Sequence, residues 1–168
     1  MKTTLDTVDD GLEQGDLRLL DTDIARRRLA SLSPLRLAYT ALDGTPRVVP
    51  VGFHWTGEEI VMGGFAPSAR GRALRANPRV ALTIDTDDTP PEVLSIRGNA
   101  EVTEVQGVVP EYETYMRAGM TTEAADAYFA ELVSRKVLME RIAVRPDWAS
   151  VVDFTTRFPA AMPDWMRS

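Results

Sequence analysis

The feature that most constrains the fold is a series of short segments in which apolar and polar residues alternate, separated by tight-turn residues. Apolar residues alternate over residues 35–41, and the Asp43-Gly44 pair that follows has the chemistry of a hairpin turn. The other segments expected to be strands are residues 47–55, 58–64, 79–85, 93–105, 138–146 and 150–154. Short strands joined by tight turns predict a mainly β protein built as a small barrel with appended helices.

Three segments instead show helical spacing. They are residues 21–33 with a cap at Asp21 or Thr22, residues 69–77, and residues 109–133 with a break near Gly119 and a second cap at Thr121 or Thr122. The ends of the chain differ from the middle, because the start is acidic and polar and the end is proline-rich. We therefore expect a flexible N-terminal arm over residues 1–16, one domain over residues 17–156, and a C-terminal tail over residues 157–168.

Composition excludes several classes of function. The 168-residue chain has a net charge of -6, which argues against a general affinity for nucleic acid or anionic membranes. It has no cysteine and a single histidine, His54, so thiol catalysis and zinc–thiolate or multi-histidine metal sites are excluded, and no metal is expected. No apolar run is long enough to span a membrane, and the start lacks the apolar stretch of a secretory signal. A cytoplasmic protein is expected.

The stretch "GFAPSARGRALRANP" indicates an anion site. Ser68 precedes the helical residues 69–77 and is a plausible N-cap, which leaves free backbone N–H groups in the first turn. Arg70 lies in that turn, where a cation is unfavourable unless something negative is bound nearby. Arg72, Arg75 and Arg79 lie on other faces and are expected to face mostly water.

Arg47 opens a neighbouring strand that also indicates ligand binding. Pro50 removes a donor from this strand, which is typical of a sheet edge whose main chain is free to meet something other than a strand. Gly63 and Gly64 end the following strand and would allow close approach to its backbone.

The ordered set of an Arg-x-x-Pro-Val strand, a glycine-rich strand end, Ser-x-Arg and Asn-Pro-Arg-Val resembles the flavin-binding split-barrel family related to pyridoxamine 5'-phosphate oxidase. The resemblance extends from about Leu17 to Phe154. It implies a six-stranded antiparallel split β-barrel with peripheral helices, assembled as a homodimer with the cofactor at the subunit interface.

The resemblance also implies the parts of the site. The cofactor is expected to be FMN, with its phosphate held by Arg47, Ser68 and Arg70 and by the backbone of Ala69. The residues expected along its ring and ribityl chain are Val48, Val49, Pro50, Val51, Gly52, Gly63 and Gly64. His54, Trp55 and Trp148 are candidates for lining the pocket of a small-molecule substrate.

The expected function is an FMN-dependent oxidoreductase that transfers hydride between the flavin and a small organic substrate. Such chemistry occurs on the cofactor and needs little from side chains, which agrees with the lack of a nucleophile–base pair in the sequence; no catalytic residue is assigned. One alternative is an F420-dependent reductase, in which Arg72 or Arg75 would bind the longer acidic tail of F420. Another is a flavin- or haem-binding protein without turnover, and haem, the less expected cofactor, would depend on His54.

Overall fold

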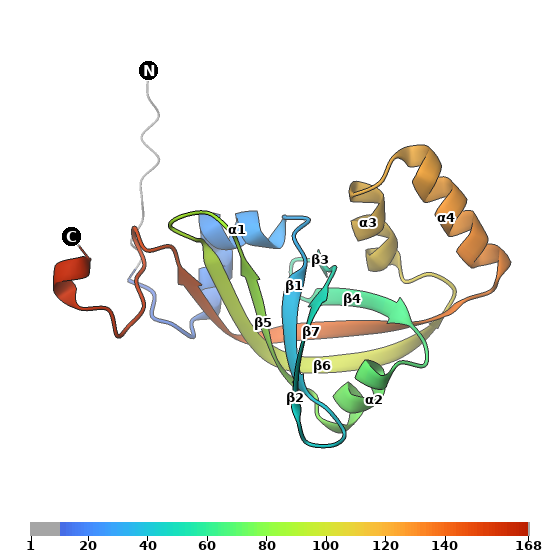
Figure 1. Cartoon of the computed structure of the whole chain (residues 1–168), viewed down its shortest axis with the longest axis horizontal. Coiled ribbons are helices and arrows are strands. Elements are labelled where there is room, and N and C mark those ends of the chain that lie inside the picture. Colours follow the sequence, from blue (N-terminus) through green and yellow to red (C-terminus); the bar gives the residue numbers. More distant parts are fainter. Residues whose placement is uncertain (1–10, 168) are drawn as a thin grey trace.

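The computed structural model describes residues 11–167 and is built around one antiparallel sheet (Figure 1). Its strands are β1 (Leu35–Thr40), β2 (Pro46–Val51), β3 (His54–Trp55), β4 (Ile60–Phe65), β5 (Arg79–Asp85), β6 (Val93–Gln106) and β7 (Leu138–Val152). They lie in the order β2-β1-β5-β6-β7-β4-β3, so the sheet is open, with β2 at one edge and β3 at the other. The mainly β split-barrel prediction is confirmed, with seven strands in the described residues where six were expected.

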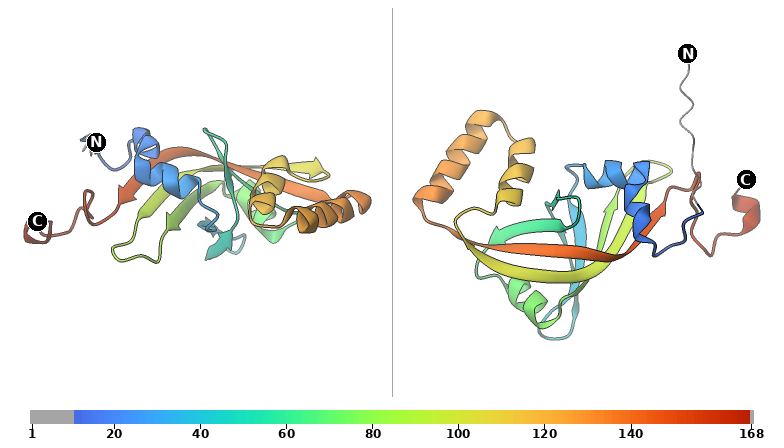
Figure 2. Two further views of the ribbon diagram at one scale, coloured as in Figure 1. Left: turned by 90° about the horizontal axis from the view of Figure 1, so that it is seen from above. Right: turned by 180° about the vertical axis from the view of Figure 1, so that it is seen from behind.

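The helices lie around this sheet rather than within it. They are η1 (Leu17–Asp21), α1 (Asp23–Leu29), α2 (Ala69–Ala76), α3 (Pro110–Ala118), α4 (Thr122–Ser134) and η2 (Asp164–Met166). In the view of Figure 1, and in the view from behind in Figure 2, α1 and the α3–α4 pair lie above the long strands β6 and β7, and α2 lies below them, beside the tip of the β1–β2 hairpin. β2 therefore runs from the end of the molecule that carries α2 toward the side that carries α3.

Two expected strand boundaries were wrong. Residues 47–55, expected as one strand, divide into β2 and β3, because the chain bends at Gly52-Phe53 and β3 pairs with β4 instead of continuing along β1. Residues 138–146 and 150–154, expected as two strands, belong largely to the single strand β7. Pro146 does not interrupt β7 because it lies opposite Gly98 at a bulge, where Asp147 is the extra residue of β7 and a proline is tolerated.

Alternation along the strands gives the sheet an apolar inner face. The main core cluster joins buried residues of every strand but β3, such as Leu37, Met62 and Ile96, and Trp55 of β3 packs against it. η1 and α1 cover one end of the cluster with Leu19 and Leu29. Burying such side chains contributes about 1.5–3 kcal/mol each. Two smaller clusters, one between α3 and the sheet and one around α4, lie on the outer face.

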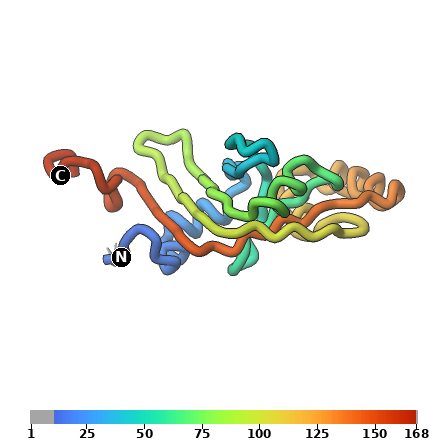
Figure 3. Tube along the Cα trace, turned by 90° about the horizontal axis from the view of Figure 1, so that it is seen from below, coloured from blue at the N-terminus to red at the C-terminus, as the bar shows by residue number. Residues whose placement is uncertain are grey.

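The two ends of the described chain lie together, away from α3 and α4 (Figure 3). The backbone N–H of Gly15 donates to Ala149 O at 2.7 Å, and Arg157 Nη1 donates to Leu12 O at 3.1 Å. Within the arm expected over residues 1–16, residues 12–16 thus lie against β7 and the tail, and residues 1–10 lie outside the described part. In residues 11–167, no helix is long and apolar enough to cross a membrane.

The helix caps give a first prediction. Thr121 is the N-cap of α4, and its Oγ1 accepts from the Ala124 backbone N–H at 3.3 Å. Thr121→Ala is expected to lower the free energy of unfolding by about 1 kcal/mol, because the helix loses a capping acceptor. Urea denaturation measures this loss, and Thr122→Ala serves as control because Thr122 already lies inside the helix. Equal losses in the two variants would contradict the cap.

Candidate functional site

The start of α2 is where an anion site was expected. Ser68 is its N-cap, as predicted, and Ser68 Oγ accepts from the Gly71 backbone N–H at 2.8 Å. No acidic residue lies in the first turn of α2. The backbone N–H groups of Ala69 and Arg70 have no acceptor within the helix, so the positive end of the helix dipole is available to an anion.

Arg70 is the second component of this helix start. Its side chain is only partly exposed, and a Cβ added to Gly64 on β4 would lie 2.9 Å from Arg70 Nη2. Within the described part of the chain, the buried Nε of Arg70 has no hydrogen-bond partner. Burial lowers the pKa of this guanidinium, although the nearby Tyr39 and Glu140 partly offset the effect. A guanidinium that is partly desolvated and lacks a hydrogen-bond acceptor is unfavourable by itself, and a bound anion would supply the missing acceptor.

Arg47 lies on the neighbouring edge strand but already has a partner. It faces Tyr39 across the β1–β2 ladder, so both side chains project from the same face of the sheet. Arg47 Nη2 donates to Asp43 Oδ2 at 3.1 Å, and Arg47 Nη1 donates to Thr45 Oγ1. The structure therefore brings Ser68 and Arg70 together and places Arg47 nearby in a hairpin ion pair that the sequence analysis did not anticipate.

The sequence analysis missed Glu140, which lies beneath the start of α2. Its side chain is 0% exposed and accepts hydrogen bonds from Ser68 Oγ and, at 2.9 Å, from Arg75 Nη1. Burial alone would raise the pKa of Glu140, but the hydrogen bonds from Ser68 and Arg75 outweigh it and hold the pKa below its ordinary value. A signal was present in the sequence, since Glu140 falls in the same alternating phase of β7 as the core residues Ile142 and Val144.

The expected ring-contact residues on β2 divide between its two faces. Val49 and Val51 pack against the core, whereas Val48 is 66% exposed and Pro50 is exposed on the other face. β2 pairs only with β1 and is an edge strand, as the proline predicted. Its outer main chain and its exposed side chains are therefore accessible to a ligand or a second chain.

Two of the expected glycines instead contact α3. A Cβ added to Gly63 would lie 2.5 Å from Tyr112 Cβ, and one added to Gly52 would overlap the Tyr115 ring. The missing side chains thus allow α3 to pack closely on the sheet. Gly64 faces the opposite side and accommodates Arg70. A cofactor role for Gly52 and Gly63 stays a prediction.

A cavity of about 770 Å³ lies between α1, β3 and α3. It is lined by apolar residues such as Leu29 and Phe53, and by His54 and Trp55, two of the three expected pocket residues. Trp148 lies elsewhere: the Arg97 guanidinium stacks on its ring at 4.0 Å, and Gly15 lies against the ring. The cavity thus gathers His54 and Trp55 but not Trp148.

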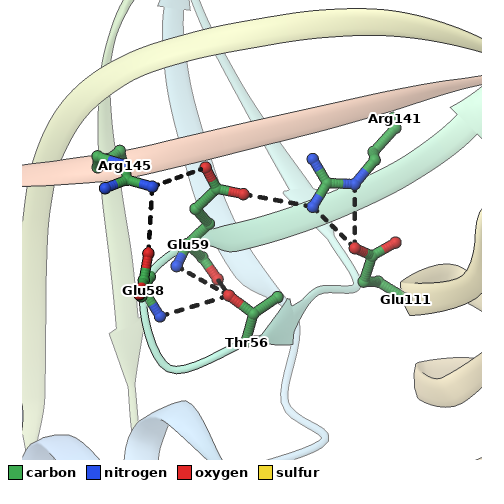
Figure 4. Close-up of polar contacts among 6 residues, drawn as sticks. All are labelled: Thr56, Glu58, Glu59, Glu111, Arg141 and Arg145. Carbon is green, nitrogen blue, oxygen red and sulfur yellow. Dashed lines mark hydrogen bonds and ion pairs between the residues drawn. The ribbon is translucent and has the colours of Figure 1, made fainter.

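An ion-pair network fixes the wall of this region (Figure 4). Arg141 donates to Glu111 of α3 at 2.8 Å and to Glu59 at 3.3 Å, and Arg145 bonds to Glu59 and Glu58 at the β3–β4 turn. Although burial would raise the pKa of Glu111, the hydrogen bonds from Arg141 keep it below its ordinary value. The network thereby ties α3 and the β3–β4 turn to β7.

These parts fit a long ligand with an anionic end and a planar end. The six residues of β2 span about 20 Å at roughly 3.3 Å per residue, between the α2 side and the α3 side of the molecule. Arg70 and the free backbone N–H groups in the first turn of α2 would hold the anionic end, and the exposed edge of β2 leads toward the apolar cavity. The unpartnered Nε of Arg70 is the feature that fits a phosphate group.

The chain is similar to a known protein family and to solved structures. The sequence profile described as pyridoxamine 5'-phosphate oxidase matches residues 22–148. A solved F420 reductase is 26% identical, with a TM-score of 0.52, and the match covers 74% of this chain and 94% of that one. No curated protein matches the chain.

Two further solved structures share the fold. A putative pyridoxamine 5'-phosphate oxidase from Listeria innocua is 17% identical with a TM-score of 0.58, covering 78% of this chain and 97% of its own. HutZ, the haem storage protein from Vibrio cholerae, is 18% identical with a TM-score of 0.52, covering 76% and 90%. Because the profile spans most of the sequence and the barrel, the chain belongs to the pyridoxamine 5'-phosphate oxidase family.

Proposed function

We propose that this protein is an oxidoreductase that binds a flavin-type cofactor, FMN or the deazaflavin F420, by its phosphate at the start of α2. The observation that carries the proposal is the buried Arg70 Nε, which has no partner in residues 11–167 and lies in a helix start without acidic residues. The match to the F420 reductase supports the choice of cofactor class.

When bound, such a cofactor supplies the ring that accepts or donates hydride. Arg70 would neutralise the phosphate, and Ser68 caps α2 so that its free N–H groups face the anion. The apolar walls around His54 and Trp55 would exclude water from a small organic substrate. The chain's own contribution is therefore binding, orientation and shielding.

The proposal includes a homodimer with the cofactor at the subunit interface. Large apolar side chains are exposed near the proposed cofactor position, with Val48 on β2 at 66% and Phe65 at the end of β4 at 52%. Apolar side chains exposed in this way are typical of surfaces that become buried on association.

The test is an absorbance spectrum of the purified protein, followed by titration with FMN and with F420. Arg70→Ala is expected to weaken cofactor binding about ten- to a hundredfold, because a charge-assisted hydrogen bond contributes about 1.5–3 kcal/mol. Arg79→Ala is the matched control, since Arg79 is exposed and already paired with Asp147.

The outcomes separate the candidates. Saturable binding that Arg70→Ala weakens and Arg79→Ala leaves unchanged supports the proposal. Unchanged affinity in a folded Arg70→Ala protein would overturn the phosphate assignment. A Soret band with no binding of either flavin would overturn the proposal in favour of haem, with His54 as the first ligand to test.

A further inference from the structure

The charges around the start of α2 nearly cancel. Arg75 is bonded to Glu140, Arg47 is bonded to Asp43, and Arg70 is left without an ion pair among those found in the described residues. Arg75 also approaches the exposed Glu104 at 3.7 Å, and Arg72 is exposed on the same helix. The four arginines Arg47, Arg70, Arg72 and Arg75 and the three carboxylates Asp43, Glu104 and Glu140 leave one net positive charge. The site is therefore matched to a ligand group that carries a single negative charge.

Ser68 has no proton left for a phosphate. A hydroxyl has one O–H to donate, and Ser68 donates it to Glu140 while its lone pair accepts from the Gly71 N–H. The Glu140 carboxylate also lies against the helix turn itself, because a Cβ added to Gly71 would overlap both of its oxygens. A bound anion would thus meet a fixed negative charge on the far side of Ser68.

We infer that Glu140 selects the charge of the phosphate, so that the site prefers a singly charged phosphodiester over a doubly charged phosphomonoester. This inference rests on the proposed function and deepens it. FMN carries a monoester whose second pKa is about 6, so it is mostly a dianion at neutral pH. F420 carries a diester, which stays a monoanion. Glu140 therefore directs the site toward F420.

Arg72 is the candidate partner for anionic groups of the ligand beyond the phosphate. It is exposed on α2, and no hydrogen bond or ion pair to it is found in residues 11–167. Arg75, the other arginine considered for an acidic tail, is bonded to Glu140 and is not available. Arg72 is accordingly the residue assigned to the carboxylates beyond the diester.

Three ligands with one ring isolate the effect of charge: riboflavin, FMN and the methyl ester of FMN, a phosphodiester. We expect the wild-type protein at pH 7.5 to bind the methyl ester at least about tenfold more tightly than FMN. Lowering the pH from 8 to 6 should strengthen FMN binding, because its phosphate gains a proton near pH 6, and leave the methyl ester unchanged. F420 is titrated in parallel.

The variant Glu140→Gln keeps the shape of the side chain and removes its charge. It should strengthen FMN binding about tenfold while changing the affinity of the methyl ester less than threefold. If the wild type binds F420 but no FMN species, gain of FMN binding in Glu140→Gln is the expected result. Unfolding curves establish that the variant is folded, and the pH titration tests the same point in the wild type alone.

Failure of the inference differs from failure of the proposed function. FMN binding as tightly as its methyl ester, or F420 binding alone with no gain of FMN binding in Glu140→Gln, would overturn the role of Glu140 and leave the cofactor proposal intact. Neither ester binding better than riboflavin, with no binding of F420, would overturn the phosphate site itself and with it the inference.

Discussion

Gly98→Ala is expected to destabilise the protein by about 3 kcal/mol. Gly98 lies in β6 at the register shift opposite Pro146, and an added Cβ would overlap the carbonyl oxygen of Arg145 and approach Val144 Cγ1 at 2.9 Å. The overlapped atom is backbone of the paired strand β7, so no side-chain rotation relieves the clash. In chemical denaturation, the midpoint of unfolding should shift to a lower denaturant concentration.

Gly119→Ala is the matched control for this prediction. Gly119 is the C-cap of α3 with an ordinary negative φ, and the nearest atom to an added Cβ lies 3.8 Å away. Its substitution should change the free energy of unfolding by less than about 0.5 kcal/mol. Equal stability of the two variants would contradict the prediction, because it would mean that the β7 backbone shifts at the bulge at little cost and relieves the clash.

The parts of the fold that the sequence predicted correctly depend on local chemistry. The β5 strand Arg79–Asp85 shows clear alternation, and the caps at Ser68 and Thr121 need only residues three positions away. The errors arise where a residue far away in the sequence determines the local structure. Pro146 looked like the end of a strand because the residue it lies opposite, Gly98 of β6, is more than 40 residues earlier in the chain.

The candidate site shows the same limit. Ser68 and Arg70 could be identified as an anion-binding helix start because their roles follow from position in one turn. Alternation placed Glu140 in the core phase of β7, but its role could not be identified, since its partners Ser68 and Arg75 are 72 and 65 residues away. The contact of Gly63 with Tyr112 likewise requires α3 to be placed on β4, which no local pattern determines.

Arg75→Ala is expected to lower the free energy of unfolding by about 2 kcal/mol at pH 7, because it removes a charged donor from the fully buried Glu140. This value is below that of a fully buried pair, since the Arg75 side chain is 37% exposed. Arg79→Ala, which removes the exposed partner of Asp147, should cost less than about 0.5 kcal/mol. Urea denaturation at several pH values measures both.

The pH dependence identifies Glu140 as the cause. In the wild type its folded pKa lies below the ordinary value of 4.5, so its stabilising contribution is present above pH 4.5 and is lost as the pH falls through the folded pKa. Without Arg75, burial dominates and should raise the folded pKa above the unfolded one, so the ionised carboxylate then destabilises the fold at neutral pH. That penalty disappears as the carboxyl is protonated. The stability difference between wild type and Arg75→Ala should therefore be largest near pH 7 and shrink toward pH 4.5, whereas a difference independent of pH would mean that Arg75 acts through packing rather than through the charge of Glu140.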